Sequence, residues 1–251
     1  MKTLSHILFP IALFLLSLNV PAQSYRVDGV KRICVDGGLA KDVEVDSLVH
    51  LYEDSIKSEL NRVVGRSSAT LEAVRPDSPM ASLWADILIE TAQPLIEQMG
   101  VSYPVVSLAN IGGIRSIINE GDIRVSDVFE VSPFENEVVI VFLRGKVLTK
   151  MLEHVAARGG EGLGAIKMTM KDGHLIEATV NGKEISRRSM YALVTLDYIA
   201  TGGDDFGMLD NQKRSSVGKL FRTAIWEYIE RRTARGEALV APVEPRIIKC
   251  E

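Results

Sequence analysis

Histidine is scarce in this sequence, and this scarcity bears on metal chemistry. Of four histidines, three follow the first 22 residues: His50, His154 and His174. A dinuclear phosphatase centre needs several His, Asp and Asn ligands brought together, yet the chain has no HxH pair, no HExxH and no CxxC motif. We therefore expect no metal ligand and no catalytic residue in this chain, and interpret the three histidines as surface residues or hydrogen-bonded core residues.

Cysteine is scarcer still. The chain has two, Cys34 and Cys250, near opposite ends of the sequence that follows the apolar N-terminus. In an oxidising compartment they would be able to form a disulfide that joins the two ends. Two free thiols are the alternative, and the sequence leaves both open because spacing alone does not show that two cysteines meet.

An excess of positive charge is also missing. The chain carries 29 basic and 33 acidic residues, for a formal net charge of −4. This balance excludes a basic groove for DNA or RNA. Neither a Walker phosphate loop nor a GxSxG nucleophile elbow occurs. A small anionic ligand would therefore have to be held by individual arginines.

Long apolar runs are confined to the N-terminus. Lys2 precedes a nearly apolar stretch over residues 7–20, and Val20-Pro21-Ala22 ends it with small residues. This pattern predicts a secretory signal peptide at residues 1–22, with an uncleaved anchor as the alternative. The stretch is short for a membrane span, and Pro10 disfavours one. We expect an exported protein, periplasmic or extracellular, with no membrane span after cleavage.

Hydrophobic periodicity predicts helices and strands without regular βαβ alternation. The expected helices cover residues 46–64, 78–99, 125–131, 146–158 and 217–234. The expected strands cover residues 67–74, 101–108, 136–145, 165–171, 175–182 and 190–199, with a hairpin turn at Asp172-Gly173 and an extended tail after the last helix. We predict an α+β fold: one domain over residues 42–251, with layered helices and largely antiparallel strands, after an N-terminal arm over residues 23–41.

The segment "NIGGIR" follows an expected strand and offers groups that suit a small ligand. Gly112 and Gly113 allow the backbone to approach a ligand closely. Asn110 can both donate and accept hydrogen bonds, so it suits a base edge or a sugar hydroxyl. Arg115 presents a planar fork that suits phosphate or carboxylate.

Two later segments add aromatic rings beside polar loops. "SPFENEVV" places Phe134 and Asn136 at a strand entrance, and "LDYIATGGDDFG" places Tyr198 shortly before Gly203 and Asp204. Each ring taken alone is as readily explained by core packing. Two rings at loop–strand junctions would also be able to clamp a flat base between them.

Together these segments resemble a known family. "NIGGIR", "VSPFENEVV", "LRGKVLTKMLEH" and "YALVTLDYIATGGDDFGML" are similar, in order and spacing, to the C-terminal domain of the 5'-nucleotidase and UDP-sugar hydrolase family. The resemblance runs from about Asp42 to the C-terminal tail. It implies that this domain binds a nucleotide and that Asn110 contacts the base and Arg115 the phosphate.

The resemblance also assigns the rings and the acidic loop. It implies base stacking by Phe134 and Tyr198, where Tyr198 replaces the more usual Phe, and ribose binding by Asp204. By letters alone, "GGDDF" also matches the signature of diguanylate cyclases. Those enzymes use cytosolic GTP, whereas this sequence predicts export, and no Arg directly precedes the glycines.

Two departures from the family limit what the resemblance implies. The metallophosphoesterase domain that precedes this domain in full-length members has no counterpart here. Ala81-Ser82 stands where relatives often have Gly followed by Asn or Arg, so the resemblance implies no phosphate contact from that helix start.

We therefore expect an exported nucleotide-recognition domain of a split 5'-nucleotidase. A separately encoded metallophosphoesterase chain would supply the divalent metals, and this chain alone would be inactive. A non-catalytic protein that captures nucleosides or nucleotides for uptake is the alternative. A stand-alone hydrolase is a third reading, for which the sequence offers no residues.

Overall fold

The computed structural model describes residues 29, 32 and 38–250. The predicted signal peptide, most of the predicted arm and Cys34 lie outside the described residues. Cys250 is exposed and forms no disulfide with any described residue, so the two alternatives for Cys34 and Cys250, a disulfide or two free thiols, both stay open. The chain divides into two compact units, residues 1–49 and 50–251. The helix α2 (Val43–Leu60) runs across this boundary, and the rest of the fold belongs to the second unit.

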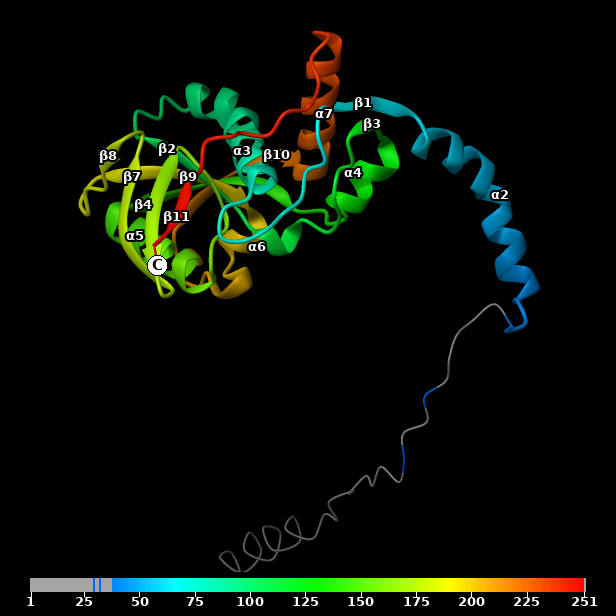
Figure 1. Ribbon diagram of the computed structural model, residues 1–251, viewed down its shortest axis with the longest axis horizontal. Coiled ribbons are helices and arrows are strands. Elements are labelled where there is room, and N and C mark those ends of the chain that lie inside the picture. The colour runs from blue at the N-terminus through cyan, green and yellow to red at the C-terminus, as the bar shows by residue number, and fades with distance from the viewer. Residues whose placement is uncertain (1–28, 30–31, 33–37, 251) are drawn as a thin grey trace, which may run out of the picture. The chain divides into compact units, whose positions relative to one another are not determined.

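A five-stranded mixed sheet forms the centre of the second unit (Figure 1). Its strands, in spatial order, are β10 (Lys213–Leu220), β4 (Glu137–Arg144), β9 (Met190–Leu196), β2 (Val105–Ala109) and β5 (Gly162–Gly164). The pair β9–β2 is parallel, and the other neighbours are antiparallel. β4 and β9 are almost wholly buried, as expected for apolar strands covered on both faces.

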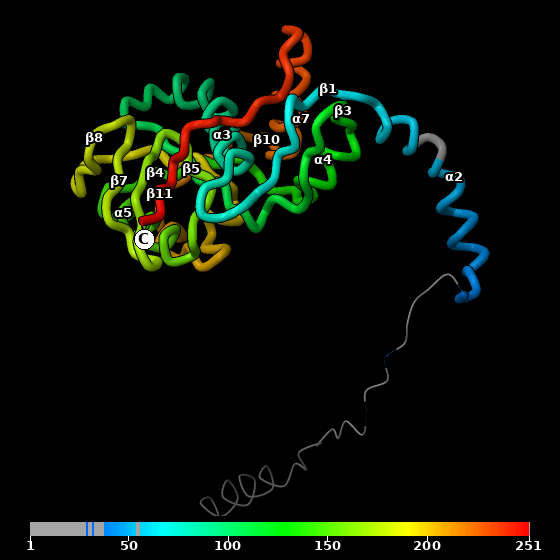
Figure 2. The backbone as a smooth tube through the Cα atoms, viewed as in Figure 1, coloured from blue at the N-terminus to red at the C-terminus, as the bar shows by residue number. Residues whose placement is uncertain are grey.

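A second sheet has four strands, in the order β11 (Ile247–Lys249), β6 (Ile166–Lys171), β7 (His174–Val180) and β8 (Lys183–Glu184). β6 and β7 form the predicted hairpin, and both turn residues, Asp172 and Gly173, have positive φ, of 49° and 76°. This geometry is the one that Asp-Gly favours in two-residue turns. Figure 2 shows the red C-terminal segment returning past α3 to β11, which pairs in parallel with β6.

Helices cover these sheets. α3 (Pro79–Gln98) packs on the five-stranded sheet, and α5 (Gly145–Ala157) contacts strands of both sheets. Ser78 caps α3, because its hydroxyl accepts a hydrogen bond from the Ala81 N–H at 3.0 Å. α4 (Val125–Val131) and α7 (Phe221–Ala234) lie beside a two-stranded sheet of β1 (Val63–Ser67) and β3 (Gly121–Arg124). None of the helices in the described part of the chain is long and apolar enough to span a bilayer.

The predicted α+β class with layered helices and largely antiparallel strands is confirmed. The predicted helices over residues 78–99, 125–131 and 146–158 correspond to α3, α4 and α5 within a residue at each end. Three other predictions were wrong in extent. Residues 217–220 belong to β10 rather than to the last helix, residues 63–67 form β1 where a helix end and a later strand were expected, and β9 ends at Leu196 where a strand to residue 199 was expected.

The errors at β10 and β1 share one physical reason, and the error at β9 has another. β10 is held by pairing with β4, and β1 by pairing with β3, more than 50 residues away in the chain. Local periodicity contains no information on such partners. After β9, the Asp197 carboxylate accepts hydrogen bonds from the Tyr198 N–H at 2.8 Å and the Glu137 N–H at 3.1 Å, and this helps to turn the chain into the short helix α6 (Asp197–Ala200).

Candidate functional site

Three strand ends meet at one edge of the five-stranded sheet. β2 and β9 run parallel, with Ser107 opposite Val194, so their carboxyl ends lie at the same edge. β4 runs antiparallel to β9, with Val138 opposite Leu196, so β4 begins at that edge. The sheet therefore gathers the loop after β2, the loop before β4 and the turn after β9.

A pocket of about 390 Å³ lies at this edge. This volume is in the range of small-molecule sites. The residues that line it are Asn110, Gly112, Gly113, Arg115, Phe134, Asn136, Tyr198 and Asp204. The structure thus brings together every candidate binding residue named from the sequence except Gly203.

Gly203 has a different place. A Cβ atom on Gly203 would lie 2.6 Å from two ring carbons of Tyr198 and 2.5 Å from the Tyr198 carbonyl oxygen. Only glycine therefore leaves room for the Tyr198 ring against the turn. Gly203 thus contributes to the pocket indirectly, because it contacts the Tyr198 ring that lines it.

Asn110 and its glycines form one side of the pocket. Asn110 is only 4% exposed, and its Nδ2 donates to Asp204 Oδ2 at 2.9 Å. Its Oδ1 is buried and has no hydrogen-bond partner among the described residues. A Cβ on Gly113 would lie 3.0 Å from this Oδ1, so glycine here accommodates the amide. A buried acceptor without a partner is costly, and the residue that carries it, Asn110, lines the pocket.

The two aromatic rings lie at the surface of the pocket. Phe134 is 46% exposed and Tyr198 is 45% exposed. Such exposure disagrees with core packing, which buries Phe206 completely. The Arg115 guanidinium lies 6.0 Å from the centre of the Phe134 ring and donates to the Gly112 carbonyl oxygen at 3.2 Å, and it forms no ion pair within the described part of the chain. The pocket therefore combines apolar ring faces with a cation that lacks a protein counter-charge.

Asp204 is held in a fixed orientation. Its Oδ1 accepts from the Tyr198 hydroxyl at 3.0 Å, and its Oδ2 is 2.9 Å from Asn110 Nδ2 and 3.2 Å from Arg158 Nη2. The Asp204 backbone is left-handed, with φ 52°, a conformation that Asp tolerates better than most residues. Its carbonyl oxygen accepts from His154 Nε2 at 3.0 Å and Arg158 Nη1 at 3.2 Å. Protein hydrogen bonds therefore hold both the backbone carbonyl and the carboxylate of Asp204.

A buried carboxylate that the sequence reasoning missed supports the site. Glu161 is 1% exposed and accepts hydrogen bonds from Arg75 Nη2 at 2.7 Å, Arg158 Nε at 2.8 Å and the Ile111 N–H at 2.6 Å. It thus joins the loop after β2 to the arginine that holds Asp204. Burial lowers the pKa of Arg158, but the hydrogen bond and charge of Glu161, with the charges of Asp204 and Asp205, raise it above its usual value. The signal in the sequence was a lone acid between glycines, in "RGGEGLG".

Ala81 and Ser82 are core residues and do not line the pocket. Ala81 is fully buried and Ser82 is 3% exposed, both in the first turn of α3. The Ala81 carbonyl oxygen lies 2.3 Å from where a Cβ on Gly162 would stand. α3 therefore packs closely on β5 at this point, and the cation that lines the pocket is Arg115.

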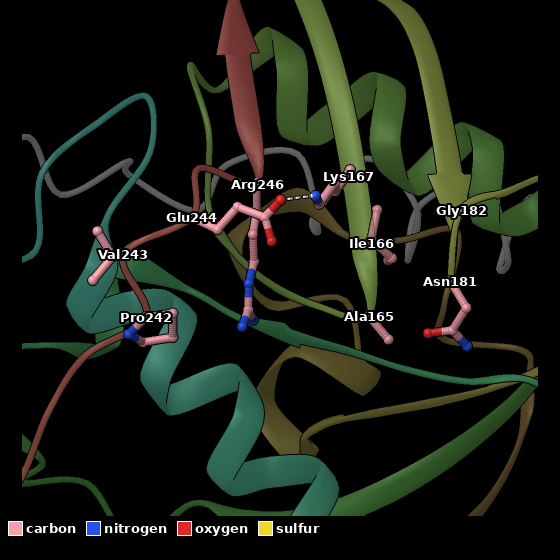
Figure 3. A pocket seen from close by; sticks show the side chains of 9 residues that line it. All are labelled: Ala165, Ile166, Lys167, Asn181, Gly182, Pro242, Val243, Glu244 and Arg246. Atoms are coloured by element: carbon pink, nitrogen blue, oxygen red, sulfur yellow. Dashed lines mark hydrogen bonds and ion pairs between the residues drawn. The ribbon is translucent and has the colours of Figure 1, made fainter.

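A second pocket, of about 440 Å³, lies between β6, the turn at Asn181 and the C-terminal segment. Figure 3 shows Lys167 and Glu244 side by side in its lining, and the hydrogen bond between them lowers the pKa of Glu244. The Arg246 guanidinium binds Asp86 through two hydrogen bonds, of 2.8 and 2.7 Å. The charged groups of this pocket are paired with one another or with α3, whereas the first pocket retains an unpaired cation and an unpaired acceptor.

Within the described ranges, no group of three or more His, Cys, Asp and Glu side chains is arranged to hold a metal ion. The groups that line the first pocket are suited to stacking, hydrogen bonding and charge pairing.

Residues 63–211 match the family described as "5'-nucleotidase, C-terminal domain". The chain is 28% identical over 204 residues to Protein UshA of Escherichia coli (strain K12), covering 79% of this chain and 36% of that protein. It is 26% identical over 198 residues to a 5'-nucleotidase of Vibrio parahaemolyticus, covering 77% of this chain and 33% of that protein. The chain thus spans about a third of the length of these relatives.

The fold agrees with solved structures. The 5'-nucleotidase precursor from Thermus thermophilus superposes with a TM-score of 0.71 at 21% identity, over 84% of this chain and 44% of that chain. The match over residues 63–211 includes every residue that lines the pocket at the sheet edge. On this evidence, the chain belongs to the family of 5'-nucleotidase C-terminal domains.

Proposed function

We propose that the pocket at the sheet edge binds the base and ribose of a nucleotide. The observation that carries this proposal is the convergence of two half-exposed rings, a buried unpaired amide oxygen and an unpaired arginine in one pocket. Phe134 and Tyr198 stack the base, and Asn110 Oδ1 accepts a hydrogen bond from it. Asp204 accepts hydrogen bonds from the ribose hydroxyls, and the Arg115 guanidinium pairs with a phosphate.

Hydrolysis is assigned to a separate polypeptide. Two-metal centres both generate the nucleophile and stabilise the leaving oxygen of a phosphate ester. The residues of this pocket are suited to binding and orienting a nucleotide. We propose that an exported metallophosphatase chain carries the metals and that this chain supplies nucleotide recognition, after export directed by residues 1–22.

Calorimetry with adenosine and AMP tests the binding step. Stacking contributes about 1–3 kcal/mol per base, and a site without metal–phosphate contacts adds a few polar interactions. Dissociation constants in the micromolar to millimolar range are therefore expected. Absence of heat with all common nucleosides and nucleotides up to millimolar concentration would count against the proposal.

A second measurement separates the split enzyme from the capture protein. AMP hydrolysis is followed with Mn²⁺ or Zn²⁺ for this chain, for a candidate metallophosphatase chain and for their mixture. Turnover that requires both chains supports the split enzyme. Nucleoside binding with no gain in turnover from any exported metallophosphatase supports capture.

A further inference from the structure

Arg158, directly after α5, holds Asp204 at two points. Its Nη1 donates to the Asp204 carbonyl oxygen at 3.2 Å, and its Nη2 forms an ion pair with Asp204 Oδ2, also at 3.2 Å. The two terminal nitrogens of one planar guanidinium thus reach the backbone and the side chain of the same residue. A lysine has a single nitrogen on a flexible stem and would not reproduce this arrangement.

The guanidinium is itself held from its other side. Its Nε donates to Glu161 Oε1 at 2.8 Å, and Glu161 is 1% exposed. The guanidinium carbon also lies 5.9 Å from the centre of the fully buried Phe206 ring. With three nitrogens bound to acceptors and one side against an aromatic ring, Arg158 is fixed before any ligand arrives.

The turn that carries Asp204 needs such a support. Asp204 and Asp205 both have positive φ, of 52° and 64°, and side chains other than glycine adopt this region at a cost. The turn also places two carboxylates next to each other in the sequence. Arg158 supplies a positive charge to Asp204 and, with His154, a hydrogen bond to the Asp204 carbonyl oxygen.

The Asp204 carboxylate keeps acceptor capacity for a ligand. Two protein hydrogen bonds reach it, from Asn110 Nδ2 at 2.9 Å and from the Tyr198 hydroxyl at 3.0 Å. An ionised carboxylate has about four lone-pair sites, so about two remain, which is the number that the two neighbouring hydroxyls of a ribose would use. A carboxylate that is already oriented loses little freedom when it binds them.

We propose that Arg158 is a positioning residue for ribose recognition: it holds the backbone and the carboxylate of Asp204 in the orientation that accepts the ribose diol. This inference rests on the proposed nucleotide site. Arg158 is not among the residues that line the pocket, so it acts through Asp204. Its replacement should therefore weaken the contribution of the diol and leave stacking of the base in place.

The test is calorimetry on the full chain with adenosine and 2',3'-dideoxyadenosine. In the wild type, adenosine should bind about tenfold more tightly, as expected for hydrogen bonds to a charged group. In Arg158→Gln, the two affinities should differ by less than about threefold, because adenosine binding weakens while dideoxyadenosine binding changes little. Arg158→Lys keeps the positive charge beside Glu161 but lacks the planar fork, so it should show the same loss if Arg158→Gln does not fold.

Arg75→Gln is the matched control. Arg75 donates to the same Glu161 oxygen at 2.7 Å, and it forms no hydrogen bond or ion pair with Asp204. Arg75→Gln should therefore keep the tenfold preference for adenosine even where it lowers the melting temperature. In an Asp204→Asn background, Arg158→Gln should have no further effect on the preference, which a double-mutant cycle measures.

The outcomes separate this inference from the proposed function. A tenfold preference that persists in folded Arg158→Gln and Arg158→Lys overturns the role of Arg158 and leaves the nucleotide site standing. So does an equal weakening of both ligands, or an equal loss of preference in Arg75→Gln, because either would mean a general loss of structure. Absence of binding by either nucleoside or by AMP to the wild-type chain overturns both proposals.

Discussion

At the residue scale, Phe134 distinguishes a binding ring from a packing ring. Because Phe134 is 46% exposed, Phe134→Ala leaves no enclosed cavity and should change the melting temperature little. It should weaken nucleoside binding by about 1–3 kcal/mol, the worth of one stacking ring. Thermal unfolding and calorimetry on the same preparation measure both effects.

Phe206→Ala is the matched control. Phe206 is fully buried and meets His154 edge-on, with ring centres 4.7 Å apart. Its truncation should cost about 3–5 kcal/mol of the free energy of unfolding. A comparable loss of stability in Phe134→Ala, with nucleoside affinity intact, would show that Phe134 is a packing residue.

Gly113 allows a second test of the pocket. A Cβ there would stand 3.0 Å from Asn110 Oδ1, and Asn110 is buried and bonded to Asp204. We expect Gly113→Ala to displace the amide and to weaken nucleoside binding by about 1 kcal/mol, the worth of one hydrogen bond.

Gly207→Ala is the control for the loss of a glycine. A Cβ on Gly207 meets no described atom within 4 Å, and Gly207 is not among the residues with positive φ. Its affinity should equal that of the wild type. Equal affinities for Gly113→Ala and Gly207→Ala would contradict the role assigned to Asn110.

At the scale of elements, Glu161, directly before β5, links the loop after β2 to the turn that carries Asp204. It accepts a hydrogen bond from the Ile111 N–H and one from Arg158, which pairs with Asp204. Glu161→Gln removes the charge that two arginines share. Breaking a buried pair costs about 3–5 kcal/mol. Because Arg75 and Arg158 keep partial contact with water, we expect Glu161→Gln to lower the free energy of unfolding by roughly 2–4 kcal/mol. Denaturant unfolding measures this loss.

Glu90→Gln is the exposed counterpart. Glu90 pairs with Arg231 at 2.8 Å, and both side chains are about half exposed. The expected loss is below about 1 kcal/mol. Equal losses for Glu161→Gln and Glu90→Gln would mean that burial adds nothing at Glu161.

Elements with local patterns were predictable from the sequence, and elements held by distant partners were not. α3 has its capping serine, its first-turn proline and its apolar face within 20 residues, and the hairpin has its Asp-Gly turn. β10 is polar along its length and is defined by its pairing with β4. Glu161 was missed for the same reason, because its partner Arg75 is 86 residues away.

The pocket itself was predictable because its residues stand directly beside strands. Asn110 follows β2, Asn136 precedes β4 and Tyr198 follows β9. The sequence did not reveal that Gly203 leaves room for the Tyr198 ring, or that the Tyr198 hydroxyl donates a hydrogen bond to Asp204. Those contacts depend on side-chain directions within one turn, for which residue order is no guide.

At the scale of the whole molecule, the proposed function separates nucleotide recognition from hydrolysis. Purified chain supplied with Mn²⁺ or Zn²⁺ should not hydrolyse AMP or UDP-glucose above background, because the nucleophile-generating centre is assigned to another polypeptide. Phosphate release measures this directly. Turnover that persists through repeated purification and is abolished by Asp204→Ala would contradict the division, since a contaminating phosphatase would not respond to that change.

An amide NMR titration of the full chain with AMP tests directly whether the pocket at the sheet edge binds a nucleotide. If it does, shifts are expected at Gly112, Tyr198 and Asp204, which line that pocket, and none at Asn181 or Glu244, which line the second pocket. Saturation should occur in the micromolar to millimolar range. Shifts confined to the second pocket, or no shifts at millimolar AMP, would contradict the account.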